Sequence, residues 1–169
     1  MKYLILSFLF TGALFINGCS SKSADDYMKT AQENVKQKKI SEAINNYESV
    51  VNEFPESSQA PDALFQIATL YQNKMVKDIS DVESYKKAEE TFRKVYNKYP
   101  EAEKAPMALF LSGFILANDL RDFQSATNTY NLFLEKYPNH ELASSAKEEL
   151  SNMGLSPDQI LKKKTQKNI

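Results

Sequence analysis

The chain has 169 residues, 42% of them hydrophobic and 25% charged, and its formal net charge is −1. This length suffices for one domain with a sizeable core, and the near-zero charge argues against a protein that binds nucleic acid. Because the chain has four glycines and one histidine, we expect neither a glycine-rich phosphate loop nor a histidine pair for a metal. We therefore expect no catalytic residues, no metal and no cofactor.

Residues 1–18 have the pattern of a bacterial lipoprotein signal peptide. After a single lysine, an apolar run covers residues 3–16, which is too short for a bilayer span of roughly 20 residues. The only cysteine, Cys19, follows Ile-Asn-Gly, and this tetrapeptide resembles a lipobox. By that resemblance, signal peptidase II would cut before Cys19 after a diacylglycerol is attached to its sulfur. The sequence thus predicts a lipidated Cys19 that begins a short tether, residues 19–23.

Two alternatives exist for this N-terminal segment: an uncleaved anchor, or an ordinary signal peptide with an incidental cysteine. The single cysteine stands at the one obligatory position of the motif, which favours lipidation. A lipidated Cys19 would leave neither a free thiol nor a disulfide, so stability would come from packing alone. Ser20 resembles the sorting signal for delivery to the outer membrane.

Two segments of the chain are nearly identical in sequence. Residues 60–65 read APDALF and residues 105–110 read APMALF, and each segment begins five residues after a proline. A third proline, Pro138, precedes Ala143 by the same interval. Self-similarity at a period of a few tens of residues indicates stacked supersecondary units.

Each of three proline-ended segments contains a small residue, an aromatic residue four positions later, and an aromatic–proline pair seven positions further on. The small residue allows a neighbouring helix to approach, the aromatic ring fills the space beside it, and the proline ends the helix. The three sets are Ala43, Tyr47 and Phe54-Pro55; Ala88, Phe92 and Tyr99-Pro100; and Ala126, Tyr130 and Tyr137-Pro138. The partner helices upstream carry, at their crossing points, Ala31, Ala68 and Gly113.

This spacing resembles the tetratricopeptide repeat, and Ala31, Ala43, Tyr47 and Pro55 match that motif without adjustment. The resemblance implies an all-α fold: a tetratricopeptide-repeat solenoid of about three helix-turn-helix units with a C-terminal capping helix. The expected boundaries are units at 24–55, 60–100 and 105–138, a cap at 141–153 within a repeat domain at 24–153, and a basic tail at 154–169.

The middle unit is longer than the others, because 20 residues separate Ala68 from Ala88. Ser80 with Glu83 has the form of a capping box at a helix start. We therefore expect the extra residues mostly to lengthen the second helix of this unit at its start. A protruding helix end is predicted near residues 75–85.

The first helices carry the candidate partner-binding residues, which we call the first-helix face. In tetratricopeptide stacks this face usually lines the groove of the solenoid. By that resemblance, three phenylalanines would form an apolar floor there for a partner's helix or extended peptide. The alternative is that these rings pack between repeats. The phenylalanines are Phe65, Phe110 and Phe114, and their expected polar companions are Gln32, Asp62, Thr69 and Gln72.

A lipid-anchored tetratricopeptide stack with aromatic-proline helix ends and an extended middle unit resembles the BamD family of outer-membrane lipoproteins. The resemblance implies a scaffold on the periplasmic face of the bacterial outer membrane, attached through its lipid. It also implies protein partners, namely a barrel insertase and its substrates in β-barrel assembly. The chain has fewer repeats than that family typically has. Two alternatives stay open: a scaffold of another envelope system of the Tol-Pal type, or an accessory subunit of a cell-wall synthase.

Overall fold

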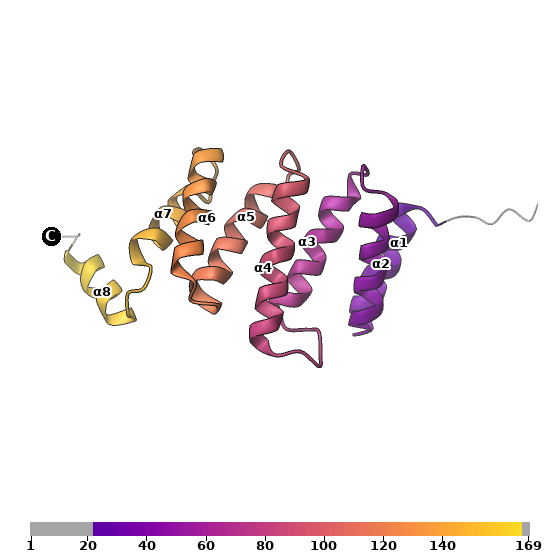
Figure 1. Ribbon diagram of the computed structural model, residues 1–169, viewed down its shortest axis with the longest axis horizontal. Coiled ribbons are helices and arrows are strands. Elements are labelled where there is room, and N and C mark those ends of the chain that lie inside the picture. Colours follow the sequence, from indigo (N-terminus) through magenta and orange to yellow (C-terminus); the bar gives the residue numbers. More distant parts are fainter. Residues whose placement is uncertain (1–21, 167–169) are drawn as a thin grey trace, which may run out of the picture.

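The computed structural model describes residues 22–166, so the predicted signal peptide and Cys19 lie outside the described residues. Residues 22–166 are helical with no strand, which confirms the predicted all-α, tetratricopeptide-like solenoid (Figure 1). In chain order the elements are α1 (Ala24–Lys36), α2 (Ile40–Glu53), α3 (Gln59–Gln72), α4 (Asp81–Lys98), α5 (Ala105–Phe114), the π-helical segment η1 (Ile115–Asp119), α6 (Phe123–Lys136), α7 (Ala143–Asn152) and α8 (Pro157–Gln166).

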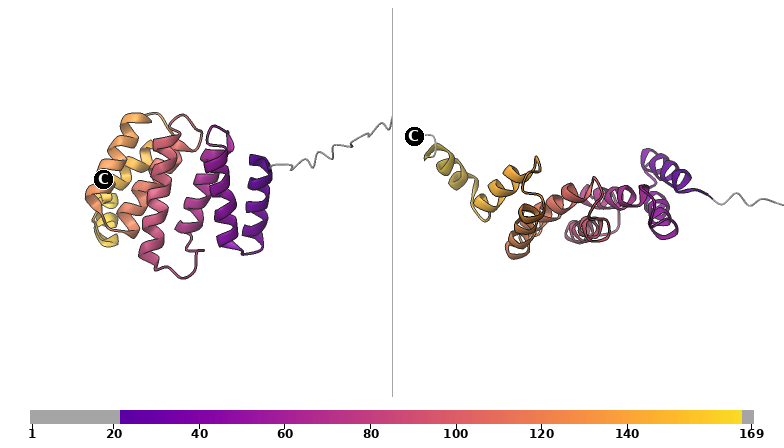
Figure 2. Two further views of the ribbon diagram at one scale, coloured as in Figure 1. Left: turned by 45° about the vertical axis from the view of Figure 1, so that its right-hand side comes forward. Right: turned by 90° about the horizontal axis from the view of Figure 1, so that it is seen from above.

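The helices form one extended row in which each helix packs mainly against its neighbours in the sequence. The first helices α1, α3, α5 and α7 make one layer and the second helices α2, α4 and α6 make the other, as the view from above in Figure 2 shows. This nearest-neighbour packing is typical of a solenoid. We propose that the units are the pairs α1–α2, α3–α4 and α5–α6, with α7 as the cap.

Small and aromatic residues occupy the helix crossings as the sequence pattern predicts. The second-helix alanines have no exposed surface, and the aromatic residues one turn later are almost completely buried. Gly113 is needed at its crossing, because a Cβ added there would lie 3.0 Å from Cε1 of Tyr130. The buried residues of this pattern are Ala43, Tyr47, Ala88, Phe92, Ala126 and Tyr130.

The second helices all end at an aromatic residue that precedes a proline. The backbone N–H groups of Phe54, Tyr99 and Tyr137 each donate to the carbonyl four residues earlier. The three residues share one conformation, with φ and ψ of −131° and 53°, −134° and 59°, and −130° and 54°. The helical region is disfavoured for a residue before proline, because its backbone clashes with the proline ring. The repeated dipeptide thus sets both the helix end and the direction in which the chain leaves it.

The middle unit differs from the expectation that its extra residues mostly lengthen a helix. Helix α4 has 18 residues where α2 and α6 have 14 each, but the loop before it, residues 73–80, is also extended. Lys74 and Asp78 turn this loop with left-handed φ values of 54° and 67°. The Ser80 side chain accepts from the N–H of Glu83 and so caps α4 as predicted. The loop and the start of α4 project beyond the neighbouring helices (Figure 1).

The described part of the C-terminal tail forms the short helix α8 at the end of the row. Gly154, with φ of +76°, ends the preceding segment. Ser156 and Gln159 exchange hydrogen bonds between their side chains and backbone N–H groups, a reciprocal cap. Within residues 22–166, no helix combines the length and apolar character needed to span a membrane.

Candidate partner-binding surfaces

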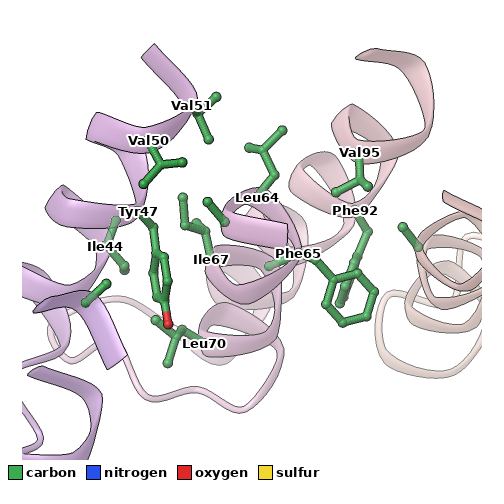
Figure 3. Packing of buried hydrophobic residues seen from close by; sticks show 14 of the residues in the cluster. Ile44, Tyr47, Val50, Val51, Leu64, Phe65, Ile67, Leu70, Phe92 and Val95 are labelled. Atoms are coloured by element: carbon green, nitrogen blue, oxygen red, sulfur yellow. The ribbon is translucent and has the colours of Figure 1, made fainter. Parts of the chain in front are cut away.

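Phe65 lies in the core of the second unit. Its side chain is 9% exposed, and its ring meets the Phe92 ring edge-on with centroids 5.1 Å apart. Figure 3 shows the ring of Phe65 on α3 turned toward Phe92 on α4. The Lys104 ammonium lies 5.5 Å from the centroid of the Phe65 ring. This ring therefore packs within its own unit and not between repeats, and its contact with a partner stays a prediction.

Phe110 packs in an equivalent way in the third unit. Its half-buried ring lies 5.5 Å from the Tyr130 ring and 5.8 Å from the Phe133 ring, both on α6. Phe114, also half-buried, ends α5, and it belongs to none of the aromatic ring pairs among residues 22–166. Of the three phenylalanines, Phe114 thus has the ring least committed to aromatic packing.

The polar candidates on α3 share one face of that helix. Asp62, Phe65, Thr69 and Gln72 recur at three- and four-residue steps, which place them in one stripe. The three polar side chains are half-buried. The Thr69 hydroxyl already donates to the Phe65 carbonyl at 2.9 Å. Gln32 comes from α1 and is exposed.

A hollow lies on the opposite side of α3 and was not predicted from the sequence. It measures about 740 Å³ and opens between α2 and α4, with α3 as its floor. Leu64, Ile67 and Tyr71 form that floor and follow a stripe of α3 that points away from Asp62 and Thr69. We call this site the α2–α4 hollow. Figure 3 shows Leu64 and Ile67 between the two flanking helices.

Lysines dominate the α4 wall of the α2–α4 hollow. Lys87, Lys94 and Lys98 all line it, together with Glu90 on the same helix and Glu48 on the α2 wall. Lys87 lies 4.0 Å from the Glu83 carboxylate and 5.8 Å from the centroid of the Tyr71 ring. The seven- and four-residue steps between the lysines put them on one line along α4. This spacing was the signal in the sequence that could have indicated the wall.

A second hollow of about 620 Å³ lies near the C-terminal end of the row, between η1, the start of α6 and the segment joining α7 to α8. Its apolar lining includes Phe123 and Leu155, which are 42% and 37% exposed. Arg121, Glu148 and Glu149 also line it, so its charge has no single sign. This hollow therefore gives no charge preference for an occupant.

An ionic cluster ties the long loop of the middle unit to its neighbours. The Lys74 ammonium lies 3.0 Å from Oδ2 of Asp81 and 5.7 Å from the centroid of the Tyr85 ring. Burial raises the pKa of Asp119, at the end of η1, although a hydrogen bond with Tyr85 acts to lower that pKa. Such π-helical segments are frequent at functional sites. Here the segment lies where the loop, α4 and the third unit meet.

Residues 22–166 contain no group of three or more His, Cys, Asp and Glu side chains that could hold a metal ion.

In a comparison with known protein families, residues 20–154 match the YfiO family, described as outer membrane lipoproteins. The matched segment starts directly after Cys19 and covers α1 to α7. No curated protein matches the chain.

Proposed function

The chain belongs to the YfiO family of outer membrane lipoproteins, and we propose that it is a lipid-anchored scaffold on the periplasmic face of the bacterial outer membrane. It holds protein partners during the assembly of outer-membrane β-barrel proteins. The family match over residues 20–154 carries this proposal, because it covers every helix of the repeat array. The assembly role rests in addition on the resemblance to the BamD family.

The proposed anchor is Cys19, the residue directly before the matched segment. Helix α1 begins at Ala24, so a lipid on Cys19 keeps the start of α1 within about 20 Å of the membrane surface at 3.3–3.6 Å per residue. Burial of acyl chains contributes about 0.8 kcal/mol per methylene. The change Cys19→Ala should give an uncleaved precursor without lipid label, and equal labelling of both proteins would contradict the anchor.

The scaffold role is supported by the shape of the array. A single row of helices offers two long faces, which is how solenoids bind extended partners. The first-helix face carries exposed Gln32 and half-buried Phe114. We place the main partner on this face, where an apolar ring beside polar groups can anchor a helix or a peptide.

Site-specific photo-crosslinking in intact membranes tests this function. A crosslinkable residue at Gln32 reports on the first-helix face, and one at exposed Asn45 on α2 is the matched control on the other layer. The proposal predicts that the Gln32 position captures a barrel insertase or an unfolded barrel protein. Capture of a Tol-Pal component or a cell-wall synthase instead would assign the scaffold to that system.

A further inference from the structure

We propose that the α2–α4 hollow is a second docking site, which binds an acidic, extended segment of another protein. It lies on the opposite side of α3 from the first-helix face, so it stands independently of the function proposed above. Three features of the hollow lead to this occupant: its size, its apolar floor and the lysines of its α4 wall.

The size of the hollow suits a short segment of chain. Its volume of about 740 Å³ falls within the range of roughly 300–1,000 Å³ for clefts that hold ligands. From Lys87 to Lys98 the α4 wall runs about 16 Å at 1.5 Å per residue. About five residues of extended chain cover that length at roughly 3.3 Å each. A whole domain would not enter the hollow.

The floor supplies an apolar contact under the middle of such a segment. Leu64 and Ile67 keep 7% and 4% of their surface exposed, and Tyr71 is half-buried. These side chains are already fixed by packing on their inner sides. A single apolar side chain laid over them removes surface from water without any rearrangement of the core. The floor thus selects a segment that contains at least one apolar residue.

The α4 wall supplies the charge preference, because three lysines line the hollow against two carboxylates, those of Glu48 and Glu90. Neither Lys94 nor Lys98 lies within ion-pair distance of a carboxylate among residues 22–166. The Lys98 ammonium lies 5.7 Å from the centroid of the Tyr99 ring. Both ammonium groups are therefore available to a partner, and they attract carboxylates.

The spacing of the lysines favours a peptide over a lipid headgroup. Three ammonium groups spread along about 16 Å of helix meet several separate carboxylates better than one phosphate. Alternate residues of an extended chain point to opposite sides, so carboxylates can follow the α4 wall while an intervening apolar residue covers Tyr71. The occupant is therefore an acidic segment interrupted by apolar residues.

Fluorescence anisotropy with a defined probe tests the site. The probe is a labelled peptide of alternating glutamate and leucine, and the matched peptide has glutamine at every glutamate. The protein is the full chain in neutral phosphatidylcholine vesicles, as wild type and as K94Q/K98Q. The control K86Q/K147Q removes two exposed lysines away from the hollow, one on α4 and one on α7.

We expect the glutamate peptide to bind wild type and the K86Q/K147Q control equally. It should bind K94Q/K98Q about tenfold more weakly, because that variant removes two exposed ion pairs with the peptide. The glutamine peptide should bind wild type at least about tenfold more weakly, and raising the salt from about 0.05 to about 0.5 M should remove most of the difference. Thermal melts of the variants check folding. The single variant K98Q gives an independent measurement of the same loss.

Three results would overturn the proposal. Equal affinity of wild type and K94Q/K98Q for the glutamate peptide would mean that Lys94 and Lys98 do not bind it. An equal loss in both double variants would reveal a general charge effect. Binding of the lysines to phosphatidylglycerol vesicles, with no affinity for the glutamate peptide, would assign the wall to a lipid surface. None of these outcomes changes the crosslinking result expected at Gln32.

Discussion

The hydroxyl of Ser112 on α5 donates a 2.9 Å hydrogen bond to the carboxylate of Glu89 on α4, in the interface between the second and third units. Ser112 has no exposed surface and Glu89 is 5% exposed. Nε of Arg93 lies 3.5 Å from the same carboxylate oxygen. A buried carboxylate is stable only when such partners replace water. This polar contact therefore fixes α4, the lysine-bearing wall of the α2–α4 hollow, against the next unit.

Removing the Ser112 hydroxyl should weaken that interface. Ser112→Ala leaves the buried Glu89 carboxylate with one partner fewer, and we expect a loss of about 1–3 kcal/mol in the free energy of unfolding. Ser144→Ala, at an exposed position of α7, is the control and should stay within about 0.5 kcal/mol. Chemical denaturation measures both, and equal midpoints would mean that the hydrogen bond contributes nothing.

Gly113→Ala should destabilise the protein, although alanine normally favours a helix by about 0.5–1 kcal/mol over glycine. The added Cβ would lie 3.0 Å from the Tyr130 ring, which is fully buried. Overpacking of this kind costs about 1–3 kcal/mol. A raised melting temperature would show that the α5–α6 crossing is looser than described.

The cap of α6 predicts a pH dependence. Hydrogen bonds from the Ser125 side chain and backbone N–H lower the pKa of Asp122 below its usual 3.8. Because the folded pKa lies below the unfolded one, ionised Asp122 stabilises the fold above pH 3.8 and loses this effect as the pH falls through the folded pKa. Asp122→Ala should lower the melting temperature at neutral pH and lose less on acidification than wild type.

Asp122→Asn separates the charge of the cap from its hydrogen bond. Its amide oxygen can still accept from the Ser125 N–H, which bonds Asp122 at 3.1 Å in wild type, but it does not titrate. We expect its melting temperature at neutral pH to lie between those of wild type and Asp122→Ala. Identical acid-induced losses in all three proteins would exclude Asp122 as a source of the pH dependence.

Two phenylalanines of the first-helix face should behave differently on truncation. Phe65→Ala removes a ring from the core and should cost about 3–5 kcal/mol of stability. Phe114→Ala removes a half-buried ring, and we expect a smaller loss of stability with a loss of more than about 1 kcal/mol in partner affinity. Melting and partner capture are measured on the same samples. Unchanged partner capture by Phe114→Ala would mean that this ring does not contact the partner.

The sequence predicted those parts of the fold that depend on local chemistry. The ends of α2, α4 and α6 follow from an aromatic-proline dipeptide, and the start of α4 follows from Ser80, which caps it. The crossing at Gly113 could also be predicted, because the repeat spacing aligns it with Tyr130. In each case the signal lies within one helix or one repeated unit.

Features that depend on the distance between helices could not be predicted in this way. The α2–α4 hollow exists because two second helices stand apart over α3, and no residue of α4 alone indicates that separation. The lysine stripe was visible, but the lack of carboxylate partners at Lys94 and Lys98 depends on where α2 lies. The π-helical segment η1 likewise depends on a backbone hydrogen bond from Leu120 to Ile115 at the junction with α6, and no sequence pattern indicated it.

The proposed role in barrel assembly is decided by one measurement: the amount of folded β-barrel protein in the outer membrane after depletion of this chain. Folded and unfolded barrels are separated by their gel mobility with and without heating. We expect folded barrels to decline on depletion, and a wild-type copy to restore them while Cys19→Ala does not. Undiminished folded barrels after complete depletion would contradict a role in barrel assembly.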